Sequence, residues 1–373
     1  MASDEIRPFS IETPDAVLDD LRERLARTRW PDQIADSGWG YGTDLAYLQD
    51  VCAYWENKFD WRAQEDRFNR WPHFVTEIDG QQVHFIHARS DNSDALPLII
   101  THGWPGSVAE FLDVIEPLRE QFHVVVPSIP GYGWSGPTTA SGWDAQRVAD
   151  AWKTLMARLG YARYGAQGGD WGAMISARLA ACDSEHMVGH HSNMLLAFPD
   201  DPSAITLTEE EQGDLVSVAE FMQTGAAYQE IQGKNPQTLA YGLTDSPAGL
   251  CGWITEKFYH WTDNNGSVED AITRDQLLTN ITLYWVTGTI NSSTRLYCES
   301  QRGQNFGPSV EYVDVPTAAA VFPKEMLRIP KAYAESRFNL VRYNRFDRGG
   351  HFAALEEPDL LIPDIKEFFA DLG

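Results

Sequence analysis

The chain has 373 residues, a formal charge of −25 and 43% hydrophobic side chains. Its length supports a catalytic body with additions and a large core. The acidic balance argues against nucleic acid and anionic lipid as partners, because both need clustered Lys or Arg. A polar N-terminus and the lack of a run of ~20 apolar residues argue against a signal peptide and a membrane helix. Four scattered cysteines without a CxxC pair fit reduced thiols, so we expect a cytoplasmic protein.

The first part of the chain, residues 1–94, is expected to be a folded leader domain. Residues 13–15 read Thr-Pro-Asp, a helix start, and apolar residues at helical spacing continue the pattern to Leu25. Residues 75–86 alternate between apolar and polar side chains around Asp79-Gly80. This alternation around an Asp-Gly pair predicts a β-hairpin.

Residues 95–195 and 308–373 are expected to form an α/β core. Short apolar runs alternate there with amphipathic stretches, which is typical of a mostly parallel sheet with helices on both faces. Between the two core segments, residues 196–307 lose this rhythm and carry helix-like patches, which suggests a cap inserted into the sheet. Strands are predicted at Leu96–Thr101, His123–Pro127, Val188–His191, Thr317–Phe322 and Phe338–Tyr343, with a last helix through Leu360 and Phe369.

The segment Gly168-Gly169-Asp170-Trp171-Gly172 matches the small-x-nucleophile-x-small pattern of a strand-to-helix elbow. Glycines are needed because the turn is tight and the nucleophile's backbone is strained. With Asp in the central position, the expected chemistry is attack of a carboxylate on a saturated carbon that bears a leaving oxygen or halide. From these five residues alone, an Asp that only caps the following helix is an equally good interpretation.

The loop His102–Ser107 follows a predicted strand at the place where α/β-hydrolases supply a second oxyanion-hole donor. The backbone N–H groups of Trp104 and Trp171 would then face one oxygen and stabilise negative charge there. Taken alone, the loop could also be an ordinary turn, which is the less favoured interpretation.

His351 follows the last predicted strand, in Asp347–Phe352, where a general base belongs. A neutral imidazole near its ordinary pKa of ~6.5 can take a proton from water. Glu325, after the penultimate predicted strand, is the candidate acid that orients this imidazole. Asp314 is the weaker candidate because it precedes the same strand. The order Asp170, Glu325, His351 repeats the nucleophile, acid and base order of these enzymes.

Together, the elbow GGDWG, the loop HGWPGS, the acid in FPKE and the ending RGGHFAALEEP resemble microsomal-type epoxide hydrolases. The leader segments RTRWPDQ, RFNRWPHF and HFIHA, and the stretch LLTNITLYWVTGTINSSTRLY, resemble the same family, so the likeness covers nearly the whole chain. It implies an α/β-hydrolase fold with a helical cap. It also implies that two cap tyrosines, matched to Tyr228 in TGAAYQEIQ and Tyr297 in SSTRLYCES, bind the epoxide oxygen beside Trp104 and Trp171.

The activity implied by the resemblance is conversion of an apolar or aromatic epoxide to a vicinal diol. Asp170 would form an ester, which water activated by His351 and Glu325 would hydrolyse without a cofactor. A haloalkane dehalogenase, or a non-catalytic binding protein of the same fold, is the alternative. Detoxification and natural-product biosynthesis both stay open, as does a homo-oligomer. Animal relatives carry a membrane-anchoring N-terminal segment, whereas this chain begins at the leader, so no membrane residence is expected.

Two motifs are interpreted as decoys. Gly131–Gly136 formally reads GxGxxG, but Pro130 and Pro137 flank it and no helix is predicted to open on its third glycine, so we expect a loop at the mouth of the active site. His190-His191 lacks the spacing of a zinc motif and is expected to lie in a strand, so no metal is predicted.

Overall fold

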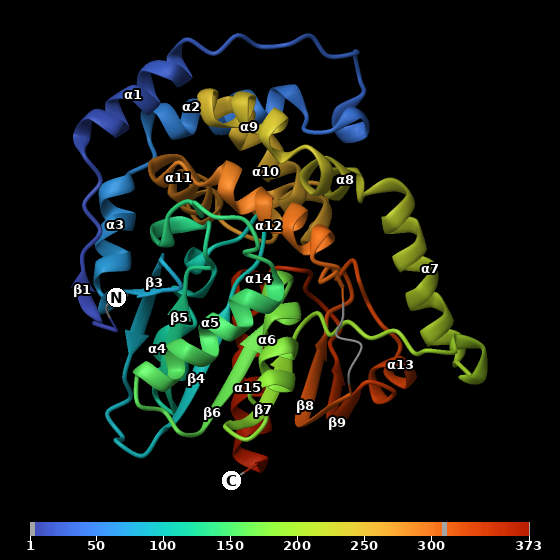
Figure 1. The fold of residues 1–373 in the computed structure, drawn as a ribbon. Helices are drawn as coiled ribbons and strands as arrows, with labels where there is room; N and C mark the ends of the chain where they lie inside the picture. Colours follow the sequence, from blue (N-terminus) through green and yellow to red (C-terminus); the bar gives the residue numbers. More distant parts are fainter. Residues whose placement is uncertain (1–3, 308–311, 373) are drawn as a thin grey trace.

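The core of the molecule is one mixed sheet (Figure 1). Within residues 4–307 and 312–372, which the computed structural model describes, nine strands follow the order β1-β2-β3-β5-β4-β6-β7-β8-β9. Pairing is antiparallel from β1 to β5 and parallel from β5 to β9. The strands are β1 (Arg7–Phe9), β2 (His73–Ile78), β3 (Gln81–Ala88), β4 (Leu96–Thr101), β5 (Phe122–Pro127), β6 (Tyr164–Gly168), β7 (Met187–Ser192), β8 (Val313–Val321) and β9 (Phe338–Arg345).

Helices cover both faces of the sheet, as expected for a parallel sheet. A Cβ added at Gly168 of β6 would meet Gly172 of α6, whereas one added at Gly165 would meet Phe369 of α15. Because side chains three residues apart in a strand point to opposite faces, α6 and α15 lie on opposite sides of the sheet. The core helices are α4 (Ile115–Arg119), α5 (Ala145–Arg158), α6 (Trp171–Cys182), α13 (Lys331–Glu335), α14 (Ala353–Glu356) and α15 (Pro358–Asp371).

A helical cap separates β7 from β8 and lies over the carboxyl ends of the parallel strands (Figure 1). Its helices pack against one another and against the leader through buried side chains such as Ile254, Phe258 and Leu278. The predicted start of the second core segment, residue 308, lies outside the described residues. The cap helices are α7 (Glu209–Thr224), α8 (Ala227–Lys234), α9 (Pro236–Asp245), α10 (Pro247–Trp261), α11 (Arg274–Thr287) and α12 (Ile290–Arg302).

The leader contributes both to the sheet and to the layer above it. The predicted hairpin is confirmed: Asp79 and Gly80 have φ values of 52° and 77°, and Ile78 pairs with Gln81 across the turn. β3 then pairs with β5, so the leader hairpin extends the core sheet. The leader helices are α1 (Asp15–Ala26), α2 (Leu45–Asn57) and α3 (Trp61–Asn69). Along the described chain as a whole, short 3-10 turns occupy Gly38–Tyr41, Val108–Phe111, Gly133–Ser135, Pro202–Ala204 and Val268–Asp270.

Candidate active site

The turn between β6 and α6 holds Asp170 at the carboxyl edge of the sheet. β6 ends at Gly168 and α6 begins at Trp171. Asp170 has φ 51° and ψ −128°, a conformation that costs a non-glycine residue about 1–3 kcal/mol. The neighbouring glycines permit the close packing that imposes it, since a Cβ at Gly172 would lie 1.9 Å from the carbonyl oxygen of Thr101. The tight elbow expected from the glycine pattern is therefore present.

The Asp170 carboxylate faces a backbone donor and an imidazole. Its Oδ1 accepts a hydrogen bond of 2.8 Å from the backbone N–H of Trp104. Its Oδ2 lies 3.3 Å from Nε2 of His351. The side chain does not cap α6, so the interpretation of Asp170 as a helix cap is wrong. Of the two expected backbone donors, Trp104 is aligned on this carboxylate, while no such bond from Trp171 is found in the part of the chain that the structure describes.

His351 and Glu325 form a buried pair beside that carboxylate. Nδ1 of His351 lies 2.8 Å from Oε2 of Glu325, and both side chains are 2% exposed. The backbone N–H of His351 donates to the carbonyl oxygen of Trp261 at the end of α10, which fixes the loop under the cap. Glu325 follows β8 at the end nearest the elbow, whereas Asp314 is exposed near the strand's beginning. The structure thus brings Asp170, His351 and Glu325 together and leaves Asp314 apart.

The surroundings of His351 set its charge in the free protein. Burial alone lowers the pKa of the imidazole, but the charges and hydrogen bonds of Glu325 and Asp170 outweigh burial and raise the pKa well above 6.5. The free protein therefore favours the protonated form of this imidazole. The ordinary pKa of about 6.5 assumed from the sequence does not describe the free protein, because two carboxylates lie within contact distance of this ring.

Four aromatic side chains surround the space next to Asp170. The ring of Tyr228 in α8 stacks on that of Trp104, with centroids 5.3 Å apart. The ring of Tyr297 in α12 lies edge-on to Trp171 at 4.8 Å and is 5.9 Å from the ring of Tyr228. Both tyrosines are buried, at 3% and 2% exposure. The cap thus places two phenols against the two tryptophans that flank the nucleophile position.

In the free protein the two phenols are un-ionised hydrogen-bond donors. Burial, helped by the negative charge of Asp170, raises the pKa of Tyr228 far above its ordinary value. Burial likewise raises the pKa of Tyr297, with Tyr228 and Asp170 acting in the same direction. Both hydroxyls therefore keep their protons at physiological pH and can donate to an oxygen near Asp170.

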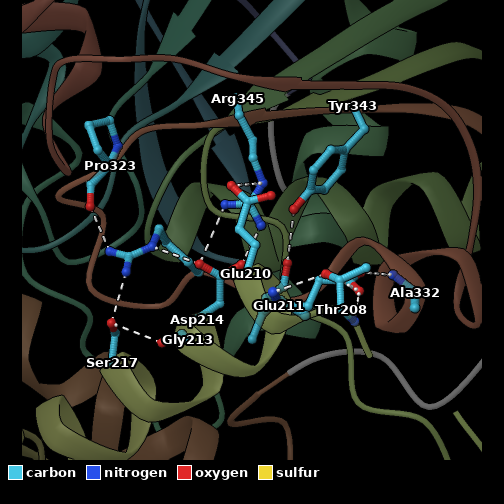
Figure 2. Close-up of polar contacts among 12 residues, drawn as sticks. Thr208, Glu210, Glu211, Gly213, Asp214, Ser217, Pro323, Ala332, Tyr343 and Arg345 are labelled. Carbon is cyan, nitrogen blue, oxygen red and sulfur yellow. Dashed lines mark hydrogen bonds and ion pairs between the residues drawn. The ribbon is translucent and has the colours of Figure 1, made fainter. Parts of the chain in front are cut away.

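An ion-pair network anchors the loop that carries Glu325 (Figure 2). The guanidinium of Arg328 donates to the carbonyl oxygens of Pro323 at 2.6 Å and Glu325 at 3.1 Å. Asp214 of α7, only 3% exposed, accepts from Arg328 at 3.1 Å and also pairs with Arg345 of β9. α7 runs beside α13 at the edge of the molecule (Figure 1). The cap is therefore connected to the acid loop through one buried carboxylate.

Replacing Asp214 with Ala is expected to lower the free energy of unfolding by about 3 kcal/mol, because it leaves two arginines without their shared partner. Urea unfolding of both proteins measures the difference. Glu210→Ala is the matched control on the same helix: Glu210 lies 3.5 Å from Arg345, but its side chain is 68% exposed, so little change is expected. Equal effects of the two substitutions would contradict the anchoring role of Asp214.

The remaining expectations concern metals, thiols, decoys and membranes. Among the described residues, no group of three His, Cys, Asp or Glu side chains could hold a metal ion. All four cysteines are free. Gly131–Gly136 is a turn with its own 3-10 segment, and His190-His191 lies in β7, where His191 contacts Asp364. Within the same described ranges, no helix is both long and apolar enough to cross a bilayer.

Several polar residues near the site escaped sequence reasoning. Glu110 sits in the same loop region as Trp104 and is buried beside Asp170. Its spacing from Ser107, Ser-x-x-Glu, is a capping-box signal, and the structure contains that capping box. Gln167 and Asn193 line the floor of the site, where no local pattern in the sequence marks them.

Comparison with known proteins places these features in a wider group. A family profile described as "Epoxide hydrolase N terminus" matches residues 6–111, and one described as "alpha/beta hydrolase fold" matches residues 97–358, which confirms the predicted fold class. A Stigmatella aurantiaca protein, whose name provisionally places it among the epoxide hydrolases, is 44% identical over 98% of this chain and 85% of its own length. Epoxide hydrolase 1 of Sus scrofa is 37% identical over 98% of this chain and 89% of its own. The structure of Aspergillus niger epoxide hydrolase is 31% identical, with a TM-score of 0.89 over 100% of this chain and 98% of that one.

Proposed function

The chain belongs to the microsomal-type epoxide hydrolases, and from this we propose that it converts its epoxide to a diol in two covalent steps. The observation that carries the proposal is the Asp170 carboxylate, held between the Trp104 N–H and the buried His351–Glu325 pair. The carboxylate is the nucleophile of the first step, and the His351–Glu325 pair supplies the base of the second.

In the first step, Oδ2 of Asp170 attacks an epoxide carbon from the side opposite the C–O bond. The new C–O bond to the carboxylate forms as the epoxide C–O bond breaks, and the epoxide oxygen leaves as an alkoxide. An alkoxide leaves poorly without acid assistance, so the hydroxyls of Tyr228 and Tyr297 donate to it and supply its proton. Oδ1 stays on the Trp104 N–H, which supports the choice of Oδ2 as nucleophile.

Ester formation prepares the second step by removing the negative charge of Asp170. That charge is one of the contributions that raise the pKa of His351, so the pKa falls once the ester exists. The imidazole can then lose its proton and serve as a base. The proton goes to bulk solvent, either directly or through the tyrosine phenolate that the first step leaves. His351 is thus protonated in the free protein and neutral in the ester form, where it acts as the base.

In the second step, water attacks Cγ of the ester and gives its proton to Nε2 of His351, while Glu325 stabilises the imidazolium. The oxyanion develops on Oδ1, where the Trp104 N–H already donates. The bond between Cγ and the product oxygen then breaks and the diol takes a proton from the imidazolium. The carboxyl group of Asp170, which now contains one oxygen from water, gives its proton to His351, and this restores the carboxylate and the protonated imidazole of the free protein.

The proposed substrates are apolar or aromatic epoxides. Aromatic rings from both the core and the cap surround the position next to Asp170, and Phe306, 39% exposed, packs against Trp171 at 5.6 Å. Such a lining offers apolar contact and ring stacking but few hydrogen bonds beyond the two phenols.

A single turnover in water enriched with oxygen-18 tests the covalent mechanism. With enzyme in excess over styrene oxide, the diol is expected to be unlabelled and the peptide containing Asp170 to gain the label, because the diol's new oxygen comes from the carboxylate. Mass spectrometry of diol and peptide measures both. Label in the diol of the first turnover would mean direct attack by water and would reject the ester.

A further inference from the structure

A small cavity lies next to the Asp170 carboxylate. It leaves about 20 Å³ for the centre of a water-sized sphere, which is room for a water molecule. Asp170 and His351 line it, together with Glu110 and Gln167. The cavity therefore touches both the carboxyl group that becomes the ester and the proposed base.

Two polar side chains face this cavity with hydrogen-bonding capacity to spare. Glu110 is 9% exposed, and its Oε1 accepts from the backbone N–H of Ser107 at 3.1 Å. The same carboxyl group also lines the cavity. Gln167 is 1% exposed, its amide donates to Asn193 at 2.9 Å, and its Oε1 has no protein partner within residues 4–307 and 312–372. Buried polar atoms are rarely left unpaired, so the Gln167 oxygen indicates that the cavity holds a molecule able to donate a hydrogen bond.

Local packing in the loop before Glu110 leaves room for its carboxyl group beside the cavity. A Cβ added at Gly106 would lie 1.4 Å from Oε1 of Glu110, so the glycine at that position leaves room for the carboxyl group. The capping box with Ser107 fixes the direction of the side chain. The carboxyl group placed in this way lines the cavity beside Asp170.

We propose that this cavity holds the water that hydrolyses the Asp170 ester and that Glu110 and Gln167 position that water. The inference rests on the proposed covalent mechanism and adds to it the residues that hold the second reactant. The water donates to Oε1 of Gln167, bonds with Oε2 of Glu110, and transfers its other proton to Nε2 of His351 as its oxygen attacks Cγ of Asp170. Water needs two to four polar partners to occupy a buried site, and these groups supply them.

The charge state of Glu110 agrees with this role. Burial raises the pKa of its carboxyl to about 8, with the negative charge of Asp170 in the same direction and His351 opposing it. Tyr284 of α11 also lies near and stays protonated because burial raises its own pKa. At pH 7 Glu110 is thus neutral and adds no negative charge next to the developing oxyanion. Above about pH 8 it ionises, which disfavours the oxyanion and slows ester hydrolysis.

Single-turnover kinetics of Glu110→Leu test the proposal, with the mass of the protein followed over time. Alkylation of Asp170 is expected to stay near the wild-type rate, whereas ester hydrolysis slows by about 10- to 100-fold through loss of the hydrogen bonds that hold the water. Glu110→Gln keeps the size and the capping contact and should restore most of the hydrolysis at pH 7. It should also abolish the fall in hydrolysis rate above about pH 8, because the titrating group is gone.

Glu65→Leu is the matched control, since Glu65 is 7% exposed and holds the backbone of Thr13 in the leader. It should lose stability without changing the ratio of the two steps. If Glu110→Leu does not fold, Gln167→Met probes the same water through another residue that lines the cavity and should slow hydrolysis alone. Equal slowing of both steps, or unchanged hydrolysis together with an alkaline fall retained in Glu110→Gln, overturns the proposal. Absence of any ester on Asp170 in the wild type rejects the covalent mechanism itself, and this inference with it.

Discussion

Replacement of His351 by Gln is expected to give a protein that reacts with one epoxide and then stops. The nucleophile and the Trp104 N–H that holds its Oδ1 are untouched, so alkylation of Asp170 proceeds. Ester hydrolysis loses its base and should slow by about 10²- to 10⁴-fold. The intact mass of the protein should therefore increase by the mass of one epoxide and stay increased, and the modified peptide should contain Asp170.

The buried Glu325 makes stability the necessary control for this variant. With His351 gone, a carboxylate 2% exposed loses its charged partner, which is destabilising. Combining His351→Gln with Glu325→Gln removes both charges and should recover stability without recovering hydrolysis. Turnover by His351→Gln near the wild-type rate would show that the base has been wrongly assigned, whatever the stability of the variant.

Local signals in the sequence were sufficient for the elements that surround the site. The Asp-Gly hairpin, the elbow glycines and the apolar runs of β4, β5, β7, β8 and β9 each depend on neighbours in the chain, and the structure contains all of them. Boundaries moved by a few residues: β8 begins at Val313, ahead of the predicted Thr317, because the strand's exposed beginning carries no continuous apolar run. The helix begun at Asp15 ends at Ala26.

Features created by long-range packing could not be predicted in this way. The charge of His351 depends on two carboxylates that the fold brings to one ring from 26 and 181 positions away. Tyr228 and Tyr297 could not be selected from 14 tyrosines by spacing, since only the docking of α8 and α12 on the core places them near Asp170. The resemblance to a family, and not a local pattern, led to these two.

Glu110 could not be predicted as a site residue for a different reason, because helix capping already explains a glutamate at this position. Its spacing from Ser107 already accounts for a glutamate by helix capping, and the structure contains the capping contact. Only the three-dimensional arrangement reveals that the same carboxyl also faces the cavity beside Asp170. A residue with a satisfactory local role can thus have a second role that no sequence pattern marks.

Changing Tyr228 and Tyr297 together to Phe is expected to slow ester formation by about 10²-fold or more while leaving ester hydrolysis within a few fold of wild type. The rings, and with them the stacking on Trp104 and Trp171, are preserved, so the substitution removes only the two hydroxyl donors. Rapid-quench measurement of alkylated protein and of diol separates the two rates.

The single substitutions then distinguish the contributions of the two phenols. Gln229 donates to the hydroxyl of Tyr228 at 3.0 Å, which orients that hydroxyl and leaves its proton free to point elsewhere. Tyr228→Phe should therefore remove a pre-oriented donor, and Tyr297→Phe the second donor to the same oxygen. If both act on one leaving oxygen, the effects of the two single changes should not add, because either phenol alone still supplies a proton. Equal slowing of alkylation and hydrolysis in the double variant would instead assign the tyrosines to packing of the cap.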